Sequence, residues 1–557
     1  MDNIRLILLF SLAFVLLLMY QAWVKDYGTA PFTIPFTAPS ASKQQSPAVV
    51  DNESVSVPDI SVAAEDAVKA APPVSSIGSE YESVTVETDL LKLEISTQGG
   101  TLQNLHLLSY QTSPETPDQK FQLLKPNTPN LHLAQSGLIG VSKDTAPTHE
   151  ARFRTEKTAY RLEDGKESLT VDMVWEHESG VQVTKSYRFY RGSYAVELNQ
   201  TVSNGSDADW AARSYVQLQR SEPHDPKESS FIYTYTGAAY FSPEDKYEKL
   251  PFDDIAESKL NRNVTDGWVA MLQHYFLTSW IPPRSEVQTF YTNHLSGPRY
   301  VIGMYSPAVT VAPGSSHSFA SQLFAGPKLQ KELAKVAEGL DLSVDYGWLT
   351  ILAQPIFWLL DKLHSLVNNW GVAIILLTIL IKLAFYKLSE TSYKSMANMR
   401  KMTPRMQALK DRYGDDKERL NQAMMEMYKK EKINPLGGCL PIVVQIPVFI
   451  ALYWVLLESV EMRQAPFALW IDNLSAPDPY FVLPLIMGVS MFVQQKLNPA
   501  PVDPLQAKIM MSLPLVFTVF FAFFPSGLVL YWTVNNLLSI TQQWYITRSI
   551  EKGAKNK

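Results

Sequence analysis

LVNNWGVAIILLTILIKLAFYKL, residues 366–388, is an apolar run that carries a lysine, Lys382, inside it. A helix needs about 20 apolar residues to cross a bilayer, so this run predicts a transmembrane helix. A lysine at mid-helix depth costs about 3 kcal/mol on insertion scales. We therefore expect the Lys382 ammonium to face water or a binding partner; snorkelling to the bilayer surface near Lys387 is the alternative.

Five other apolar runs are long enough to cross a bilayer, which predicts six transmembrane helices in all. Residues 1–25 are expected to be an uncleaved anchor. A cleaved signal peptide is the alternative, but Gln21-Ala-Trp-Val-Lys25 lacks the small residues of a cleavage site. The other four predicted transmembrane helices are 435–458, 480–497, 509–526 and 527–547.

The charges of the connecting segments predict the orientation of these helices. Residues 389–434 are crowded with Lys and Arg, whereas residues 459–479 carry mostly carboxylates. Because positive charge stays on the cytoplasmic side, the first segment is expected inside and the second outside. Residues 498–508 then form a cytoplasmic loop, residues 548–557 a short basic cytoplasmic tail, and both termini are cytoplasmic.

The middle of the chain reads as an extracytoplasmic domain on a tether. Residues 26–80 are rich in Pro, Ser and Ala and predict a flexible linker. Residues 81–335 alternate apolar and polar side chains, as in Val181-x-Val183, which predicts a β-sandwich. Residues 336–365 are apolar and aromatic with interspersed charges, and they predict an amphipathic helix in the bilayer interface.

The cytoplasmic segment 389–434 predicts a helical hairpin. A break is expected at Tyr413-Gly-Asp-Asp416, where Gly414 can end one helix and Asp415 or Asp416 can begin the next. Methionines gather on one face of each helix, which offers either an adaptable surface for hydrophobic guests or, as we favour, packing for the hairpin seam. These methionines are Met399, Met402 and Met406 on the first helix and Met424 and Met427 on the second.

The composition gives no sign of enzyme chemistry. The net charge of −6 over 557 residues does not suggest a nucleic-acid partner, and the single cysteine, Cys439, excludes an internal disulfide. The nine histidines lack metal-ligand spacing, and the chain has no phosphate loop and no nucleophile elbow. We predict no catalytic residue, metal or cofactor, and leave open a sugar-binding or hydrolytic role for the soluble domain.

Polar groups from several predicted helices are expected to share a wet cavity with Lys382. Thr378 lies one turn away on the same face, together with Asn368 and Gly371. The last predicted helix carries a polar stripe, and the second of the five C-terminal helices adds Gln445. The stripe consists of Trp532, Asn535, Ser539 and Gln542.

Lys382 has no acidic partner among these predicted helices, which argues against ion-coupled transport. A lone positive charge instead suits a polar, often acidic guest that passes part of the way across. A small-solute channel or transporter stays open as a rival, and so does an envelope glycan enzyme that uses the helices as an anchor.

At these residues the chain resembles the YidC/Oxa/Alb family of membrane protein insertases. The matching strings are Asn434-Pro-Leu-Gly-Gly-Cys-Leu-Pro441, Arg463-Gln-Ala-Pro-Phe-Ala-Leu-Trp470 and Phe524-Pro-Ser-Gly-Leu-Val-Leu-Tyr531. The resemblance implies a bacterial inner-membrane protein with a periplasmic domain and a five-helix core, whose hydrophilic groove opens to cytosol and lipid. It also implies that Lys382 stands where relatives usually have arginine, and Trp532 where many have tyrosine.

The resemblance further implies the partners of such an insertase. They are nascent inner-membrane proteins, the Sec translocon with its accessory subunits, a ribosome or targeting particle at the cytoplasmic face, and membrane lipids. We expect Lys382, Thr378, Gln445, Trp532 and Asn535 to line the groove. The client helix is expected to leave for the lipid along Phe449, Tyr453, Phe517 and Phe520.

Overall fold

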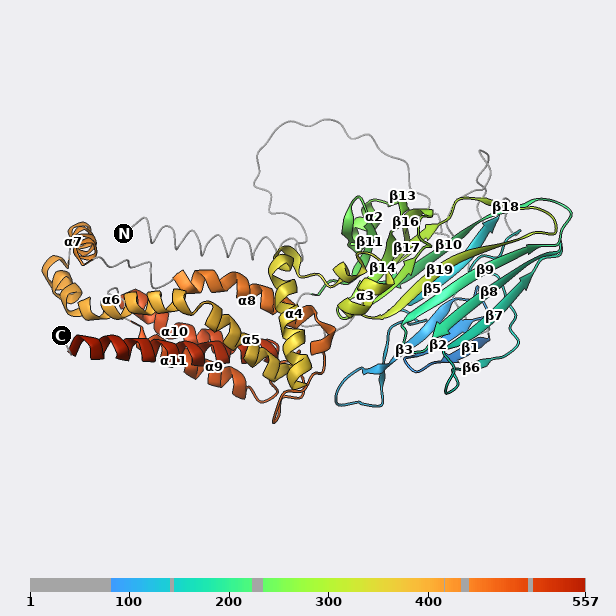
Figure 1. Ribbon diagram of the computed structural model, residues 1–557. Helices are drawn as coiled ribbons and strands as arrows, with labels where there is room; N and C mark the ends of the chain where they lie inside the picture. Colours follow the sequence, from blue (N-terminus) through green and yellow to red (C-terminus); the bar gives the residue numbers. More distant parts are fainter. Residues whose placement is uncertain are drawn as a thin grey trace, which may run out of the picture.

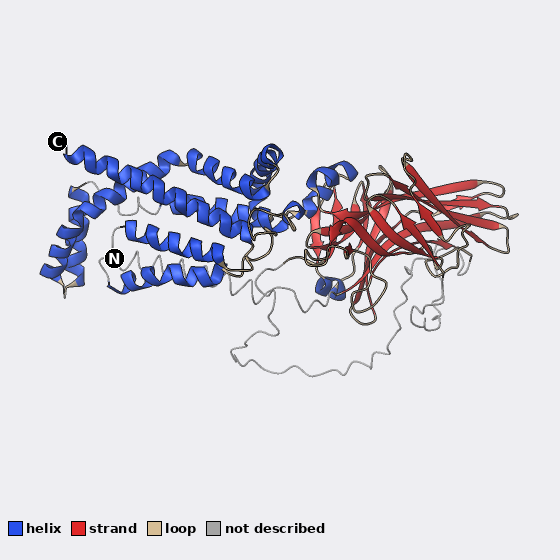
Figure 2. Ribbon diagram, turned by 90° about the horizontal axis from the view of Figure 1, so that it is seen from below, coloured by secondary structure: helices blue, strands red, loops and turns tan. Residues whose placement is uncertain are grey.

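The computed structural model describes residues 82–140, 145–222, 234–414, 416–431, 440–498 and 504–555. The predicted anchor 1–25 and tether 26–80 lie outside these residues. Within them the strands and the helices form two separate parts of the molecule, which Figures 1 and 2 show from two directions. The helical part follows the strand part in the sequence, as the change from period two to long apolar runs predicts.

The described strands form two antiparallel-rich sheets, one of eleven strands and one of eight. The first sheet runs β13 (Asn261–Thr265), β16 (Val287–Leu295), β17 (Arg299–Tyr305), β10 (Trp210–Ser221), β5 (His132–Gly140), β3 (Leu102–Gln111), β2 (Leu91–Ser96), β1 (Ser83–Glu87) and β6 (Ala159–Arg161), with β18 (Val309–Val311) beside β10 and β4 (Lys120–Gln122) beside β3. The second runs β12 (Lys246–Leu250), β11 (Gly237–Ser242), β14 (Trp268–Gln273), β15 (Phe276–Ile281), β19 (Ser316–Pro327), β9 (Ala195–Asn204), β8 (Val181–Tyr190) and β7 (Ser168–Glu176).

The two sheets bury their facing sides, so the predicted β-sandwich is confirmed. Strand β8 shows the period of two, because every second side chain from Val181 to Phe189 is buried. One of these inward positions holds a lysine, Lys185, whose Nζ donates to Gly99 O (2.6 Å), Ser136 O (2.7 Å) and Ser136 Oγ (2.9 Å). All three ammonium hydrogens therefore have acceptors, and Lys185 cross-links the two sheets.

The helical part begins directly after β19. Its elements are α3 (Gln330–Val336), η1 (Leu340–Ser343), η2 (Gly347–Leu349), α4 (Thr350–Val367), α5 (Trp370–Ala384), α6 (Tyr386–Tyr413), α7 (Lys417–Lys430), α8 (Leu440–Glu458), η4 (Val460–Met462), α9 (Val482–Leu497), α10 (Pro504–Phe521) and α11 (Ser526–Lys555), while α2 (Phe252–Glu257) belongs to the β domain. Helix α4 lies across the bundle end that faces the β domain, and α7 lies at the far end (Figure 1).

Two adjacent asparagines separate α4 from α5. Asn368 adopts a left-handed conformation (φ 51°) and ends α4, and the Asn369 side chain accepts a hydrogen bond from Val372 N and begins α5. The expectation that Asn368 shares the helical face of Lys382 is therefore wrong. The reason is that an asparagine tolerates left-handed backbone and stops a helix where periodicity alone would continue it.

The helix that carries Lys382 ends earlier than expected. Helix α5 stops at Ala384, and α6 continues after Phe385 in a new direction, bent by 67°. Among the described residues, no helix taken singly combines the length and apolar character needed to cross a bilayer; α5 and α6 meet that test only as a bent pair. At the other end of the chain, α11 continues through most of the expected tail 548–557, up to Lys555.

The predicted break between the hairpin helices is present. Helix α6 ends at Tyr413, and the Asp416 side chain caps α7 by accepting a hydrogen bond from Arg419 N at 3.0 Å. Gly414 follows the last residue of α6, but it keeps a right-handed conformation (φ −47°). The turn therefore does not use the left-handed freedom of this glycine.

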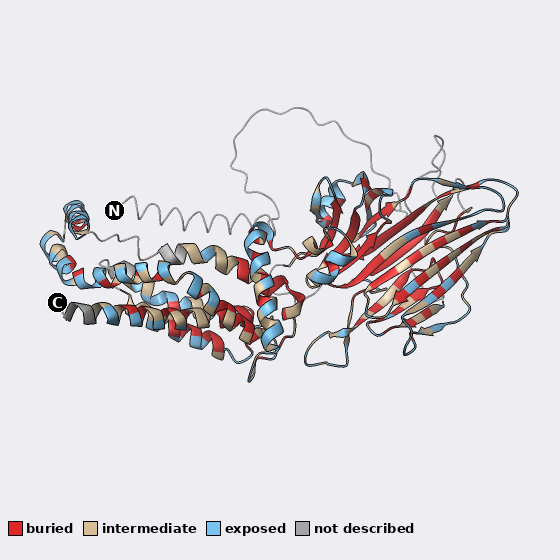
Figure 3. Ribbon diagram, in the orientation of Figure 1, coloured by how far each residue is buried: buried red, intermediate tan, exposed pale blue. Residues whose placement is uncertain are grey.

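One arginine joins the β domain to the helices. Arg463, just after η4, donates through Nη2 to Gln111 O at 2.5 Å, and its guanidinium lies over the rings of Phe121 (5.5 Å) and Phe276 (5.4 Å). His274 adds a contact of 2.8 Å from Nε2 to Leu457 O at the end of α8. One buried apolar cluster runs from the β domain through α4 into the bundle. Figure 3 shows buried residues along the strands and at the bundle end beside α4, with α6 and α7 largely exposed.

A buried histidine makes the stability of the β domain depend on pH. Burial, with the Lys185 charge as a smaller cause, lowers the pKa of His149 from 6.5 to about 3. The unfolded chain then binds a proton that the folded domain does not. Lowering the pH from 6.5 toward 3 should therefore reduce the free energy of unfolding by up to about 1.4 kcal/mol per pH unit for this side chain.

The measurement is urea unfolding of the full chain in micelles, followed by β-sheet circular dichroism across this pH range. His149→Gln should flatten the slope. His177→Gln, at a half-buried histidine that is hydrogen-bonded to Ser179, is the control and should keep the slope. Equal slopes for the wild type and the His149 variant would contradict the assignment.

Candidate functional site

Lys382 sits on α5 and is buried, with 8% of its surface exposed. Its Nζ donates to Ser539 Oγ on α11 at 2.7 Å, and Ser539 is the only hydrogen-bond partner of this ammonium among the described residues. Ser539 in turn donates to Asn535 O at 2.7 Å. The predicted meeting of the Lys382 helix with the polar stripe of the last helix is thus present, through Ser539.

The other expected groove residues contribute in different ways. Thr378 is buried one turn from Lys382, but its hydroxyl donates to Ile374 O at 2.7 Å, within its own helix. Asn535 takes part through its backbone carbonyl. Gln445 is half-buried on α8, and no hydrogen bond links it to Lys382 in the described chain.

Helix α11 carries a second set of polar groups beyond Ser539. Asn536 is buried and donates through Nδ2 to Ser490 Oγ on α9 at 3.2 Å. Further along, Gln542 Nε2 and Gln543 Oε1 are buried and have no hydrogen-bond partner in the described part of the chain. Buried polar groups are normally satisfied, so these two atoms mark a place where water or a guest belongs.

The sequence reasoning missed Asn536 and Ser490. Asn536 lies next to Asn535, yet it points toward α9 because successive residues of a helix differ by about 100° in direction. Ser490 is one of the few polar residues in an apolar run, which was the available signal.

The aromatic residues expected to guide a client fall into two groups. Phe449 faces the interior, edge-on to Trp532 at 4.5 Å, and Tyr453 lies 6.2 Å from Phe524. Phe517 packs 6.0 Å from Phe521, whereas Phe520 is 43% exposed. Of the four, Phe520 is the one that offers most of its ring to the surroundings.

The bundle end next to α4 is filled by the loop between η4 and α9. Phe467 packs against Gly371, and its carbonyl accepts a hydrogen bond from Asn369 Nδ2 at 2.9 Å. Asp478 is buried and accepts hydrogen bonds from Trp470 Nε1 in the loop (2.9 Å) and from Leu483 N in the first turn of α9 (2.7 Å). This loop is part of the packed core, so the bundle is closed at this end.

The hairpin methionines pack between the two helices. Met402, Met406 and Met424 are buried, Met399 and Met427 are half-buried, and the Tyr428 hydroxyl lies 3.2 Å from Met406 Sδ. Arg405 pairs with Glu431 across the same hairpin at 2.8 Å. These contacts favour packing of the seam over an open surface for guests.

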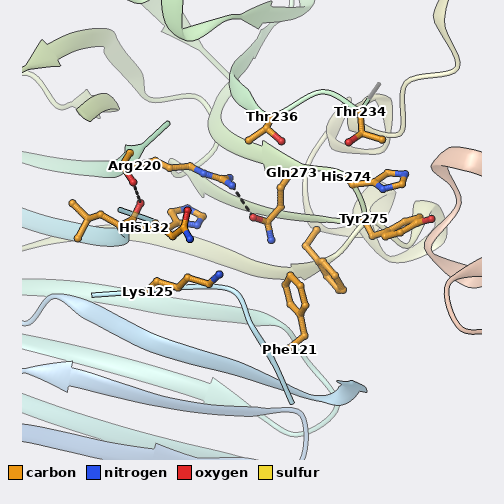
Figure 4. A pocket seen from close by; sticks show the side chains of 13 residues that line it. Phe121, Lys125, His132, Arg220, Thr234, Thr236, Gln273, His274 and Tyr275 are labelled. Atoms are coloured by element: carbon orange, nitrogen blue, oxygen red, sulfur yellow. Dashed lines mark hydrogen bonds between the residues drawn. The ribbon is translucent and has the colours of Figure 1, made fainter. Parts of the chain in front are cut away.

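The β domain has a pocket of about 180 Å³ near the junction, shown in Figure 4. Its Arg220 donates to Leu272 O and Gln273 Oε1, and its buried His132 is bound to Leu123 O and Thr278. No Asp or Glu occurs among the described lining residues. The pair of carboxylates that glycoside hydrolysis normally uses is therefore missing from this lining.

Comparison with known proteins decides the family. Residues 83–359 match the YidC periplasmic domain, and residues 362–554 match the 60Kd inner membrane protein. A chain from Thioalkalivibrio sulfidiphilus, named membrane protein insertase YidC, is 53% identical over 569 aligned residues that cover all of both chains. This chain belongs to the YidC family.

Further YidC relatives extend the comparison. The insertase from Methylococcus capsulatus is 52% identical and covers 99% of both chains. A crystal structure described as an active YidC insertase with its first transmembrane domain resolved is 18% identical, covers 84% of this chain and 93% of that one, and has a TM-score of 0.38. The chain is thus an inner-membrane insertase and not an enzyme, and its β-sandwich is the periplasmic domain of the YidC family.

At the closed end of the bundle, one glycine leaves room for the Phe467 ring. A Cβ at Gly371 would lie 2.0 Å from the Phe467 ring, so Gly371→Ala must displace the loop and should lower the free energy of unfolding by about 1–3 kcal/mol. Thermal unfolding in micelles measures this. Adding Phe467→Ala should remove most of the clash. If the double variant loses more free energy of unfolding than the two single variants lose together, the proposed contact is contradicted.

Proposed function

We propose that Lys382 is the groove charge of this insertase and receives the polar flank of a client segment. The observation that carries the proposal is the buried ammonium with a single neutral partner, Ser539, in the described bundle. An ammonium has three N–H donors, so two remain for carboxylates or carbonyls of a guest. Gln542 Nε2, buried without a partner, supports the same wet path on α11.

The direction of entry follows from the two ends of the bundle. The end beside α4 is filled by the loop with Phe467, whereas the two buried polar atoms without partners in the described chain, Gln542 Nε2 and Gln543 Oε1, lie toward the end that carries α6 and α7. A client is therefore proposed to enter from the hairpin side, which the Lys- and Arg-rich sequence of 389–434 assigns to the cytoplasm. Both termini would then be cytoplasmic, with 1–25 as the sixth transmembrane helix.

The proposed mechanism changes positions and not bonds. Lys382, with Thr378, Gln445, Trp532 and Asn535 around it, shelters the polar flank, and the apolar segment leaves toward lipid past Phe520. The gain is burial of the apolar client helix in lipid, at about 25 cal/mol per Å² of apolar surface. By family resemblance we extend the proposal to the Sec translocon and to a ribosome or targeting particle, for which the basic loop 389–434 is a suitable contact.

Insertion by purified protein tests the role of Lys382. In liposomes with a single-span client whose short translocated tail is acidic, Lys382→Ala should lower insertion at least about tenfold, since a charge pair at 4 Å is worth about 4 kcal/mol at an effective dielectric constant of 20. Lys382→Glu should be worse, and Lys382→Arg should stay active because the charge is kept.

The controls separate the role of the residue from the activity of the protein. Equal insertion by all four proteins would exclude Lys382 as the groove charge. Equal insertion by empty liposomes would show that the assay does not report insertase activity. Flux of small solutes that survives deletion of 389–434 would instead support a channel.

The hairpin seam gives a second test. Met406→Ala removes a buried side chain between α6 and α7 and should destabilise the hairpin by about 2–5 kcal/mol, seen as faster hydrogen exchange in both helices. Met425, 50% exposed on α7, is the matched control. If the methionines serve mainly as a client surface, Met425→Ala would instead lower insertion more than Met406→Ala does, with no change in hydrogen exchange of the hairpin.

A further inference from the structure

The Ser539 hydroxyl links two helices. It accepts a hydrogen bond from Lys382 Nζ on α5 at 2.7 Å and donates to Asn535 O on its own helix α11 at 2.7 Å. Ser539 is buried, with 3% of its surface exposed.

A serine hydroxyl has one hydrogen and two lone pairs. The hydrogen is used on Asn535 O, so toward Lys382 the Ser539 oxygen acts as an acceptor. A lone pair of this oxygen then points where the ammonium sits. Without this acceptor, the flexible four-carbon stem of Lys382 could turn its charge toward the nearby bilayer surface.

We propose that Ser539 is the positioning residue that holds the Lys382 charge inside the groove. The inference rests on the proposed role of Lys382. It adds a specificity consequence, because a positioned charge helps acidic client tails and matters little for uncharged ones.

The test compares two single-span clients in proteoliposomes, identical except that the short translocated tail carries either two aspartates or two asparagines. Ser539→Ala should lower insertion of the acidic client about fivefold, which corresponds to about 1 kcal/mol at 1.4 kcal/mol per factor of ten, and should leave the uncharged client nearly unchanged. Ser539→Thr keeps the hydroxyl and should restore the wild-type ratio between the clients.

Thr541→Ala is the matched control. Thr541 lies on the same helix, is exposed, and donates to its own helix at Leu537 O (2.9 Å), so its loss should alter neither client.

The Lys382→Ala background separates this inference from the proposed function. If Ser539 acts through Lys382, Ser539→Ala has no further effect there. A defect that persists in that background, or one that is equal for both clients, would make Ser539 a merely structural residue and overturn the inference. A Lys382→Ala protein that inserts the acidic client normally would instead overturn the proposed role of Lys382 itself.

Discussion

The hydrogen bond from Lys382 to Ser539 joins the apolar helix α5 to the polar stripe of α11. A buried charge costs several kcal/mol unless it is paired, and a neutral hydroxyl compensates only part of that cost. The bundle around this bond therefore cannot close into a dry core. It must keep room for water or for a guest with a complementary charge, and this requirement separates the helical part from an ordinary packed bundle.

The same constraint explains why the two ends of the bundle differ. Beside α4, aliphatic and aromatic side chains form one cluster that continues into the β domain, and the loop with Phe467 and Asp478 fills the remaining space. Toward α6 and α7, buried amides such as Gln542 lack partners. This difference between the two ends supports the proposed entry of a client from the side of α6 and α7.

Much of this arrangement could be predicted from periodicity and charge. The alternation from Val181 to Phe189 predicts a two-sided sheet, and the family strings around Arg463 and Phe524 identify an insertase core. Helix ends were harder, because a single left-handed residue such as Asn368 overrides an apolar pattern that would otherwise continue. The sequence predicts that the partner of Lys382 belongs to a polar stripe on the last helix. Identifying Ser539 within that stripe requires knowing how α11 is rotated about its axis relative to α5.

Buried polar residues of the β domain were beyond sequence reasoning for a related reason. Lys185 occupies an inward position of β8, and its acceptors Gly99 and Ser136 are far away in the sequence. Only the register of the two sheets brings the three together. Such contacts depend on the whole topology, which local patterns do not contain.

The Arg463 contact couples the orientation of the periplasmic domain to that of the membrane helices. The Arg463 guanidinium beside the stacked rings of Phe121 and Phe276 follows α8 by only five residues, and His274 contacts the end of α8 itself. With these contacts intact, a tilt of α8 that widens the proposed groove must swing the whole β domain. A small tilt of α8 inside the bilayer would then produce a larger displacement at the far edge of the sandwich. The length of the strands places that edge tens of ångströms away, in the aqueous compartment.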